Sequence, residues 1–270
     1  MTGSQQTARK AVFITGAAAG IGRATALAFA RKGFTVGGYD INESGLESLA
    51  GEIERVGGRA IVGHLDVTDP DEMAQRVGDF ARAAGNRLDI LINNAGILRA
   101  GRFEELDLPG HLREIDINVK GVVNGLYAAF PYLRDTPGSV VVNLSSASAI
   151  YGQVELANYS ATKFFVRGIT EALDLEWQRH GIRVIAMWPL YVRTGMTANI
   201  KTGTTESLGI RLTAEDVAEA IVKATEPSLL RRALHQVHFP VGTQTKALAL
   251  GSRFSPGWLT RLVNKKLAHS

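Results

Sequence analysis

Ser139-Val-Val-Val-Asn-Leu-Ser-Ser146 is the stretch from which the rest of this chain can be ordered. Its β-branched apolar run is typical of a buried strand, and Ser145-Ser146 stand where that strand ends. After a polar loop, Asn158-Tyr-Ser-Ala-Thr-Lys163 opens a segment with apolar residues at helical spacing. Because chemistry in open α/β sheets gathers at the carboxyl ends of strands, this strand and helix predict a site between them.

Tyr159 and Lys163 stand four positions apart on the predicted helix, so their side chains share one face. An ammonium beside a phenol favours the phenolate, and we therefore expect Lys163 to lower the pKa of Tyr159 from its ordinary value near ~10. The phenol would then serve as an acid or a base near neutral pH. By itself, a Tyr and a Lys at this spacing are more often an ordinary exposed pair of surface residues. The catalytic interpretation therefore depends on a cofactor site elsewhere in the chain.

The composition indicates one sizeable core: 270 residues, 45% of them hydrophobic. Cysteine is absent, which excludes disulfides, cysteine metal sites and cysteine nucleophiles, and we predict no metal site. Residues 1–9 are expected to form a disordered lead-in. Residues 1–10 are polar and lack the apolar stretch of a signal peptide. Without an apolar run that could span a bilayer, a cytoplasmic protein is expected.

The net charge of +4 is unevenly distributed, because no acidic residue follows Glu226. We predict no nucleic-acid surface, which would need a basic face with groove-reading elements. Residues 246–270 mix apolar and basic side chains and form a basic amphipathic extension of the 10–245 catalytic domain. It could pack on the pocket mouth, cover a second subunit or lie on an anionic membrane. Seven basic residues follow Glu226: Arg231, Arg232, Lys246, Arg253, Arg261, Lys265 and Lys266.

Strand and helix patterns alternate along the chain, which favours right-handed βαβ units. We predict a single doubly wound, Rossmann-type α/β domain with a mostly parallel sheet of about seven strands. Thr197 to Gly209 is expected to be a loop or lid. Strands are expected over 10–15, 34–39, 59–65, 88–92, 139–144, 182–188 and 235–239, and helices over 23–32, 44–56, 70–84, 111–133, 159–175 and 214–225.

Gly16-Ala-Ala-Ala-Gly20-Ile-Gly22 lies between the first strand and its helix, where glycines let a pyrophosphate approach the helix N-terminus. A helix-packing turn explains three glycines about as well. Asp40 ends the second strand, where a carboxylate can bind a ribose diol and repel a 2′-phosphate. No Arg or Lys lies between Ala17 and Gly22 or just after Asp40, so NAD is favoured over NADP. The alternative is a capping role for Asp40.

Two further strand ends complete the candidate cofactor site. Asp66 ends the third strand, where it could meet an adenine amino group or serve as a turn residue. Asn94-Ala95-Gly96 end the fourth strand, where small residues let the backbone approach a nucleotide or simply make a turn.

Together these motifs resemble the short-chain dehydrogenase/reductase family, over about 10–239. The resemblance implies hydride transfer between NAD(H) and an alcohol or carbonyl substrate. Tyr159 would donate or accept the proton, Lys163 would also bind the nicotinamide ribose, and Ser146 would orient the substrate oxygen. Asn118 would hold a proton-relaying water, although a helix-to-backbone hydrogen bond is the alternative. The resemblance also implies cofactor contacts by Ile21, Ile41, Val67, Pro189, Val192 and Thr194. Thr194 would bind the carboxamide of the nicotinamide.

One departure concerns Pro189-Leu190, because the family usually has Pro-Gly there. Leucine tolerates positive φ poorly, so Leu190 is expected to reshape the pocket. The family's layout implies a substrate pocket formed by Leu98, Ser148, Gln153, Leu190 and Tyr191. This set is mixed with an apolar bias, so we expect a lipophilic substrate. Family members are commonly dimers or tetramers, which the apolar helix of Asn118 allows. Two alternative functions are a non-catalytic dinucleotide-binding sensor or scaffold, and a protein that binds a membrane surface through its C-terminal segment.

Overall fold

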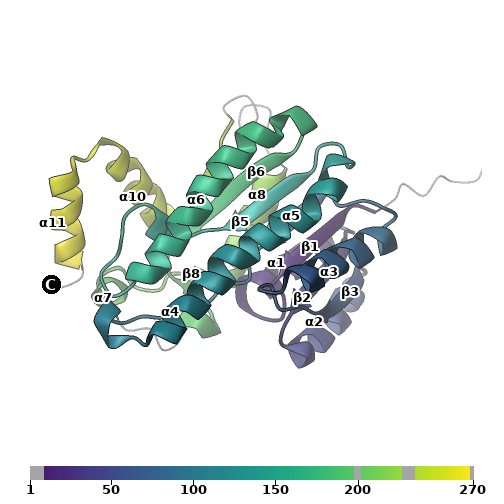
Figure 1. Cartoon of the computed structure of the whole chain (residues 1–270), viewed down its shortest axis with the longest axis horizontal. Helices are drawn as coiled ribbons and strands as arrows, with labels where there is room; N and C mark the ends of the chain where they lie inside the picture. Colours follow the sequence, from purple (N-terminus) through teal and green to yellow (C-terminus); the bar gives the residue numbers. More distant parts are fainter. Residues whose placement is uncertain (1–8, 198–201, 227–234, 268–270) are drawn as a thin grey trace, which may run out of the picture.

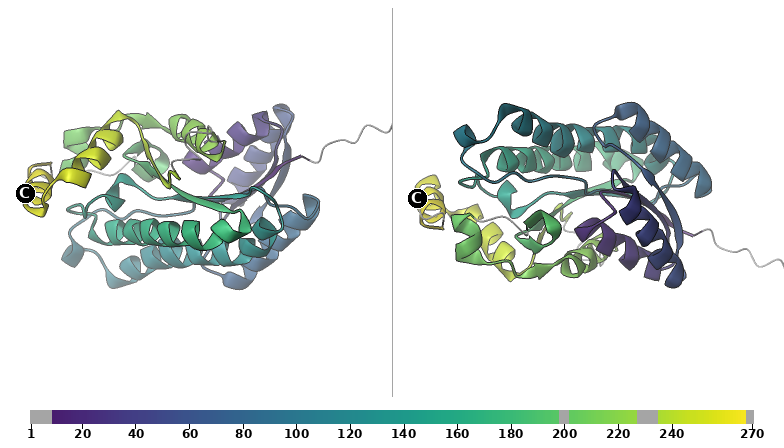
Figure 2. Two further views of the ribbon diagram at one scale, coloured as in Figure 1. Left: turned by 90° about the horizontal axis from the view of Figure 1, so that it is seen from above. Right: turned by 90° about the horizontal axis from the view of Figure 1, so that it is seen from below.

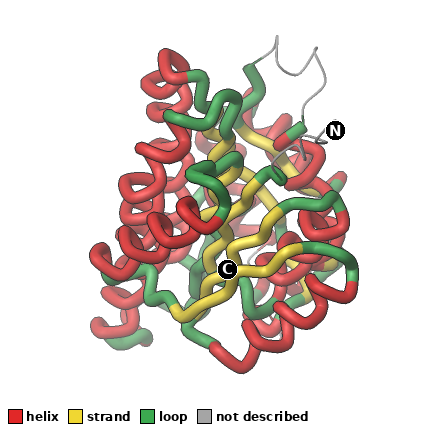
Figure 3. The backbone as a smooth tube through the Cα atoms, turned by 90° about the vertical axis from the view of Figure 1, so that its right-hand side faces the viewer, coloured by secondary structure: helices red, strands yellow, loops and turns green. Residues whose placement is uncertain are grey.

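The computed structural model describes residues 9–197, 202–226 and 235–267. A seven-stranded parallel sheet runs through the molecule between two layers of helices (Figures 1 and 3). Its spatial order is β3-β2-β1-β4-β5-β6-β9, so the order reverses between β1 and β4 and opens a crevice at their carboxyl ends. The strands are β1 (Ala11–Thr15), β2 (Thr35–Asp40), β3 (Arg59–His64), β4 (Ile90–Asn93), β5 (Val140–Leu144), β6 (Arg183–Pro189) and β9 (His238–Val241).

Both faces of the sheet are covered, as the uninterrupted apolar strands predicted. The two layers are seen on either side of the sheet in Figure 2. One consists of α1 (Gly20–Arg31), α2 (Glu43–Arg55) and α8 (Ala214–Thr225), and the other of α3 (Pro70–Ala83), α5 (Gly121–Arg134) and α6 (Ala157–Trp177). This is the doubly wound Rossmann-type fold that the alternating pattern predicted.

The helix predicted over 111–133 is longer and contains a π turn. It begins as α4 (Leu108–Ile115), widens at Asp116–Lys120 and continues as α5. A π turn inserts one extra residue into a helix and frequently marks a functional site. Asn118 lies within it and faces the segment that follows β4.

Two predictions around the site need correction, and one small sheet was missed. The last strand is His238–Val241 rather than 235–239, and His235 has a positive φ before it. The segment 197–209 is not only a loop, because Thr202 and Thr205 form a capping box that starts α7 (Gly203–Leu208). Its residues 198–201 lie outside the described ones. A small parallel sheet of β7 (Val192–Arg193) and β8 (Leu212–Thr213) was not predicted.

The C-terminal part is helical. α10 (Thr243–Phe254) follows the edge strand β9, and α11 (Gly257–Leu267) lies at the far end of the molecule, beyond the sheet (Figure 1). Residues 1–8, with most of the predicted lead-in, and residues 268–270 are outside the described part. Among the described residues, no helix has the length and apolar character needed to cross a membrane.

Candidate active site

A cavity of about 450 Å³ opens at the carboxyl ends of the central strands. Of the predicted site residues, only Gly22 and Asn118 lie behind its wall rather than on it. Sequence reasoning did not single out other lining residues, among them Ile97, Arg113, Asp116 and Met196. The predicted residues that line it are Gly16, Gly20, Ile21, Asp40, Ile41, Asp66, Val67, Asn94, Ala95, Gly96, Leu98, Ser146, Ser148, Gln153, Tyr159, Lys163, Pro189, Leu190, Tyr191, Val192 and Thr194.

Two glycines of the turn, Gly16 and Gly22, have no room for a side chain. A Cβ on Gly16, whose φ is +67°, would lie 2.8 Å from the Cα of Ala95. One on Gly22 would lie 2.1 Å from the carbonyl oxygen of Gly16. α1 begins here with Ala19 as its N-cap, which provides no side-chain acceptor for the first N–H groups. A backbone cradle with uncapped donors fits the pyrophosphate of a dinucleotide.

Asp40 is tied to this turn on both sides. One carboxylate oxygen accepts a hydrogen bond from the Ala18 N–H at 3.0 Å, and the other accepts one from the Asn42 N–H at 3.0 Å. Asn42 is the N-cap of α2, so Asp40 is not the capping residue. Arg23, which directly follows the turn, binds Glu52 and two backbone carbonyls and does not line the cavity.

The ends of β3 and β4 form the next part of the wall. Asp66 accepts two hydrogen bonds from Thr68, at 2.9 and 2.8 Å, and mainly the backbone one lowers the pKa of Asp66. It is therefore a turn residue that also faces the cavity. Asn94 donates from its amide to the carbonyl oxygens of Thr15 and Gly16, both at 2.9 Å. These bonds fix the end of β4 against the glycine turn.

A chain of polar groups begins at Ser146, after β5. The Ser146 hydroxyl accepts a hydrogen bond from the Ser148 N–H at 3.1 Å and contacts the Ser148 hydroxyl at 3.2 Å. Ser148 in turn donates to Gln153 Oε1 at 3.1 Å, which the Tyr191 hydroxyl approaches at 3.5 Å. Ser146 is thus held in one orientation at the wall of the cavity.

Lys163 and Tyr159 share a face of α6, as predicted, but the expected pKa shift of the phenol is wrong. Burial raises the pKa of Tyr159, opposed by a hydrogen bond with Ser146, because desolvation disfavours the phenolate. Lys163 donates to the Leu144 carbonyl at 2.9 Å, and its Nζ lies 5.4 Å from the centre of the Tyr159 ring. Burial lowers the pKa of Lys163 to about 8, and Glu114 opposes that shift.

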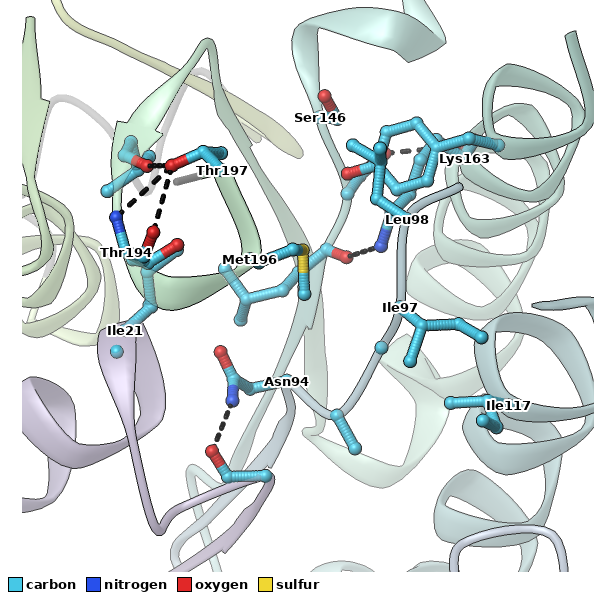
Figure 4. A pocket seen from close by; sticks show the side chains of 18 of the residues that line it. Ile21, Asn94, Ile97, Leu98, Ile117, Ser146, Lys163, Thr194, Met196 and Thr197 are labelled. Atoms are coloured by element: carbon cyan, nitrogen blue, oxygen red, sulfur yellow. Dashed lines mark hydrogen bonds between the residues drawn. The ribbon is translucent and has the colours of Figure 1, made fainter. Parts of the chain in front are cut away.

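Asn118 makes the helix-to-backbone contacts that were considered as the alternative. Its side chain accepts from the Ile97 N–H and donates to the Ile97 carbonyl, both at 2.9 Å, and also donates to Thr162. The π turn therefore holds the segment after Gly96 against the amino-terminal part of α6. Figure 4 shows Ile97 and Leu98 on that segment.

Glu114 is a buried carboxylate that sequence reasoning missed. It is 1% exposed, and it accepts hydrogen bonds from the Arg99 N–H at 3.0 Å and from the Asn158 amide at 2.7 Å. Burial raises its pKa. The available signal was an acidic residue one helical turn before Asn118, on the same helix face.

The other end of the cavity is apolar. Leu98 and Met196 reach into it from two different segments (Figure 4), and Leu156 and Leu190 add to the wall. The only described non-glycine residues with positive φ are Asn86, Glu155 and His235, so the backbone at Leu190 does not need glycine. Leu190 is half-buried and contributes its side chain to the cavity instead.

Comparison with known proteins agrees with this architecture. Residues 10–205 match the family model of the short chain dehydrogenases. The chain is 38% identical to a 3-oxoacyl-[acyl-carrier-protein] reductase of Thermotoga maritima, over 71% of this chain and 77% of that one. It is 34% identical to a cyclohexanol dehydrogenase of an Acinetobacter species, over 71% and 76% respectively.

Comparison with a solved structure supports the same family assignment. The 3-ketoacyl-(acyl-carrier-protein) reductase from Brucella melitensis complexed with NADH superposes with a TM-score of 0.76 and 30% identity, over 86% of this chain and 96% of that one. Sequence family, fold and cavity agree, and the chain belongs to the short-chain dehydrogenase/reductase family of nicotinamide-dependent oxidoreductases.

Proposed function

We propose that this chain interconverts a lipophilic alcohol and its carbonyl compound with NAD(H), using Tyr159 as the proton donor and acceptor. The observation that carries the proposal is the cavity that joins the uncapped glycine turn and Asp40 to Ser146, Tyr159 and Lys163. A bound nicotinamide supplies or accepts the hydride. The residues named here bind and orient the reactants and move the proton.

The proton chemistry follows from the environment of Tyr159. Its raised pKa keeps the phenol protonated near neutral pH, which suits a proton donor in carbonyl reduction. Ser146, whose hydroxyl is held by Ser148, orients the substrate oxygen in front of that phenol. The Lys163 ammonium, held by the Leu144 carbonyl, lies next to the ring and binds the nicotinamide ribose.

The preference for NAD and for a lipophilic substrate has separate support. A carboxylate at position 40 repels a 2′-phosphate, and Arg23 is occupied by Glu52. At the substrate end, Leu98, Leu156 and Met196 present apolar surface. The relative named as a cyclohexanol dehydrogenase acts, by its name, on an apolar cyclic alcohol.

Titration with NADH and NADPH, followed by fluorescence, is the first test. Tight NADH and weak NADPH binding supports the NAD site, and the reverse preference overturns it. Turnover of cyclic alcohols and ketones is then compared with that of Tyr159→Phe. The loss of a general acid lowers kcat by at least about 100-fold while NADH still binds. Full activity in Tyr159→Phe overturns the assigned mechanism, and NADH binding without turnover of any alcohol or ketone favours the non-catalytic rival.

A homodimer or homotetramer is the proposed assembly. α5 and α6 present large exposed apolar side chains, including Tyr127 at 86% and Leu175 at 74% exposure. Light scattering gives the number of subunits, and a monomer at all concentrations contradicts the proposal.

A further inference from the structure

Two C-terminal helices carry a row of exposed apolar side chains. On α10, Leu250 and Phe254 are 64% and 80% exposed, and on α11, Trp258 and Leu262 are 68% and 58% exposed. Within each helix the two residues are four positions apart, so they stand one above the other on a single face. We call these four residues the C-terminal apolar row.

Basic residues continue the row at both ends. Lys246 stands four positions before Leu250, and Lys266 four positions after Leu262, and both are exposed. Arg261 and Lys265 are exposed on α11 as well. Neither helix contains an aspartate or a glutamate. On each helix this face therefore combines apolar side chains with positive charge that no acidic residue of the same helices neutralises.

The combination of apolar and basic side chains indicates which partner this surface binds. A second copy of the same face would place lysines opposite lysines, and like charges brought together in this way oppose association. Helices that combine Trp, Phe and Leu with Lys and Arg are typical of binding in the interface of a bilayer. Anionic headgroups then attract the lysines, while the aromatic and aliphatic side chains enter the acyl boundary.

We infer that α10 and α11 dock this protein on the surface of an anionic lipid bilayer through the C-terminal apolar row and its flanking lysines. The position of α11 links this surface to the cavity. Asn264 of α11 donates a hydrogen bond to the carbonyl of Gly152, and the next residue, Gln153, lines the cavity. Asn264 is two positions from Leu262 and so lies on the other side of α11, which means that docking places α11 between the lipid and the segment Gly152–Gln153.

The test is sedimentation of the full-length protein with vesicles of phosphatidylcholine, with and without phosphatidylglycerol. We expect binding to the vesicles that contain phosphatidylglycerol, and weaker binding when NaCl is added, because salt screens the attraction. Tryptophan emission shifts to shorter wavelength on binding, and Trp258→Phe lacks this shift although Trp177 and Trp188 remain. Neither readout involves catalysis, so the outcome is independent of the proposed function.

Matched variants locate the contact. Phe254→Ser removes an 80% exposed side chain and weakens partitioning about tenfold, whereas Val56→Ser, 39% exposed at the end of α2 and away from α5 and α6, leaves it unchanged. Lys265→Glu/Lys266→Glu weakens it by about tenfold or more. Circular dichroism verifies that each variant is folded.

Three outcomes overturn the inference. The first is no sedimentation with either vesicle. The second is equal partitioning of the wild type and Phe254→Ser. The third is a concentration-dependent oligomer that Phe254→Ser dissociates while vesicles bind nothing, which would make the row an interface between copies of this chain.

Discussion

The buried carboxylate of Glu114 accepts a hydrogen bond of 2.7 Å from the side-chain amide of Asn158, the residue directly before Tyr159. The other carboxylate oxygen accepts from the Arg99 N–H, next to the cavity residue Leu98. Glu114 therefore joins the segment after β4 to the first turn of α6. Its negative charge also raises the pKa values of both Tyr159 and Lys163.

Glu114→Gln is predicted to change the pH dependence of activity and not only its magnitude. Loss of the charge lets the pKa of Lys163 fall further, so the alkaline limb of kcat/KM moves to lower pH. Glu105→Gln, an exposed carboxylate near the same loop, serves as a control with the same change in charge. A uniform loss of activity with an unchanged pH profile would assign Glu114 a purely structural role.

Lys163 itself predicts where that alkaline limb lies. Its pKa is lowered to about 8, so the ammonium is charged below that pH and loses its proton as the pH rises through it. We expect kcat/KM for carbonyl reduction to decline above about pH 8, as measured from initial rates. Lys163→Arg keeps a positive charge throughout, and its residual activity should lack this decline. If the decline persists in Lys163→Arg, another group causes it.

Asp40→Ala/Ile41→Arg is predicted to shift cofactor preference towards NADPH. The change removes the carboxylate that repels a 2′-phosphate and adds a guanidinium at a side chain that is 61% exposed beside the cavity. We expect NADH to bind about tenfold more weakly and NADPH more tightly, by fluorescence titration. The single variant Ile41→Arg keeps the Asp40 carboxylate, so it separates attraction of the 2′-phosphate by the guanidinium from its repulsion by Asp40. An unchanged ratio of the two dissociation constants would falsify the assigned role of Asp40.

Local patterns were sufficient to predict most of this fold. The apolar run ending at Ser146 and the glycine turn before α1 depend on neighbours in sequence, and the structure has both where they were expected. The family pattern also anticipated most of the residues that line the cavity.

The features that the sequence did not predict depend on contacts between segments that are distant in the chain. β7 and β8 each have two residues and pair with one another, Val192 with Leu212 and Arg193 with Thr213. The pKa of Tyr159 is governed by desolvation, which neither its sequence neighbours nor Lys163 reveals. Glu114 looks like an ordinary helix-surface residue until the segment at Arg99 folds over it.

Two glycine-to-alanine substitutions, each in a helix, are predicted to act in opposite directions. In α1, the new Cβ of Gly22→Ala would lie 2.1 Å from the Gly16 carbonyl oxygen and 2.6 Å from the Asn94 amide nitrogen. The glycine turn would have to move, at a cost of about 1–3 kcal/mol, and NADH binding would weaken with it.

In α6, a Cβ on Gly168 meets no atom of its own chain within 4 Å, so Gly168→Ala keeps all contacts within the chain and restricts the unfolded chain. That change should stabilise the protein by about 0.5–1 kcal/mol. Urea unfolding of both variants measures the difference, and NADH titration reports on the turn. If Gly22→Ala is as stable as Gly168→Ala and binds NADH normally, the close packing of the turn is not what requires glycine at position 22.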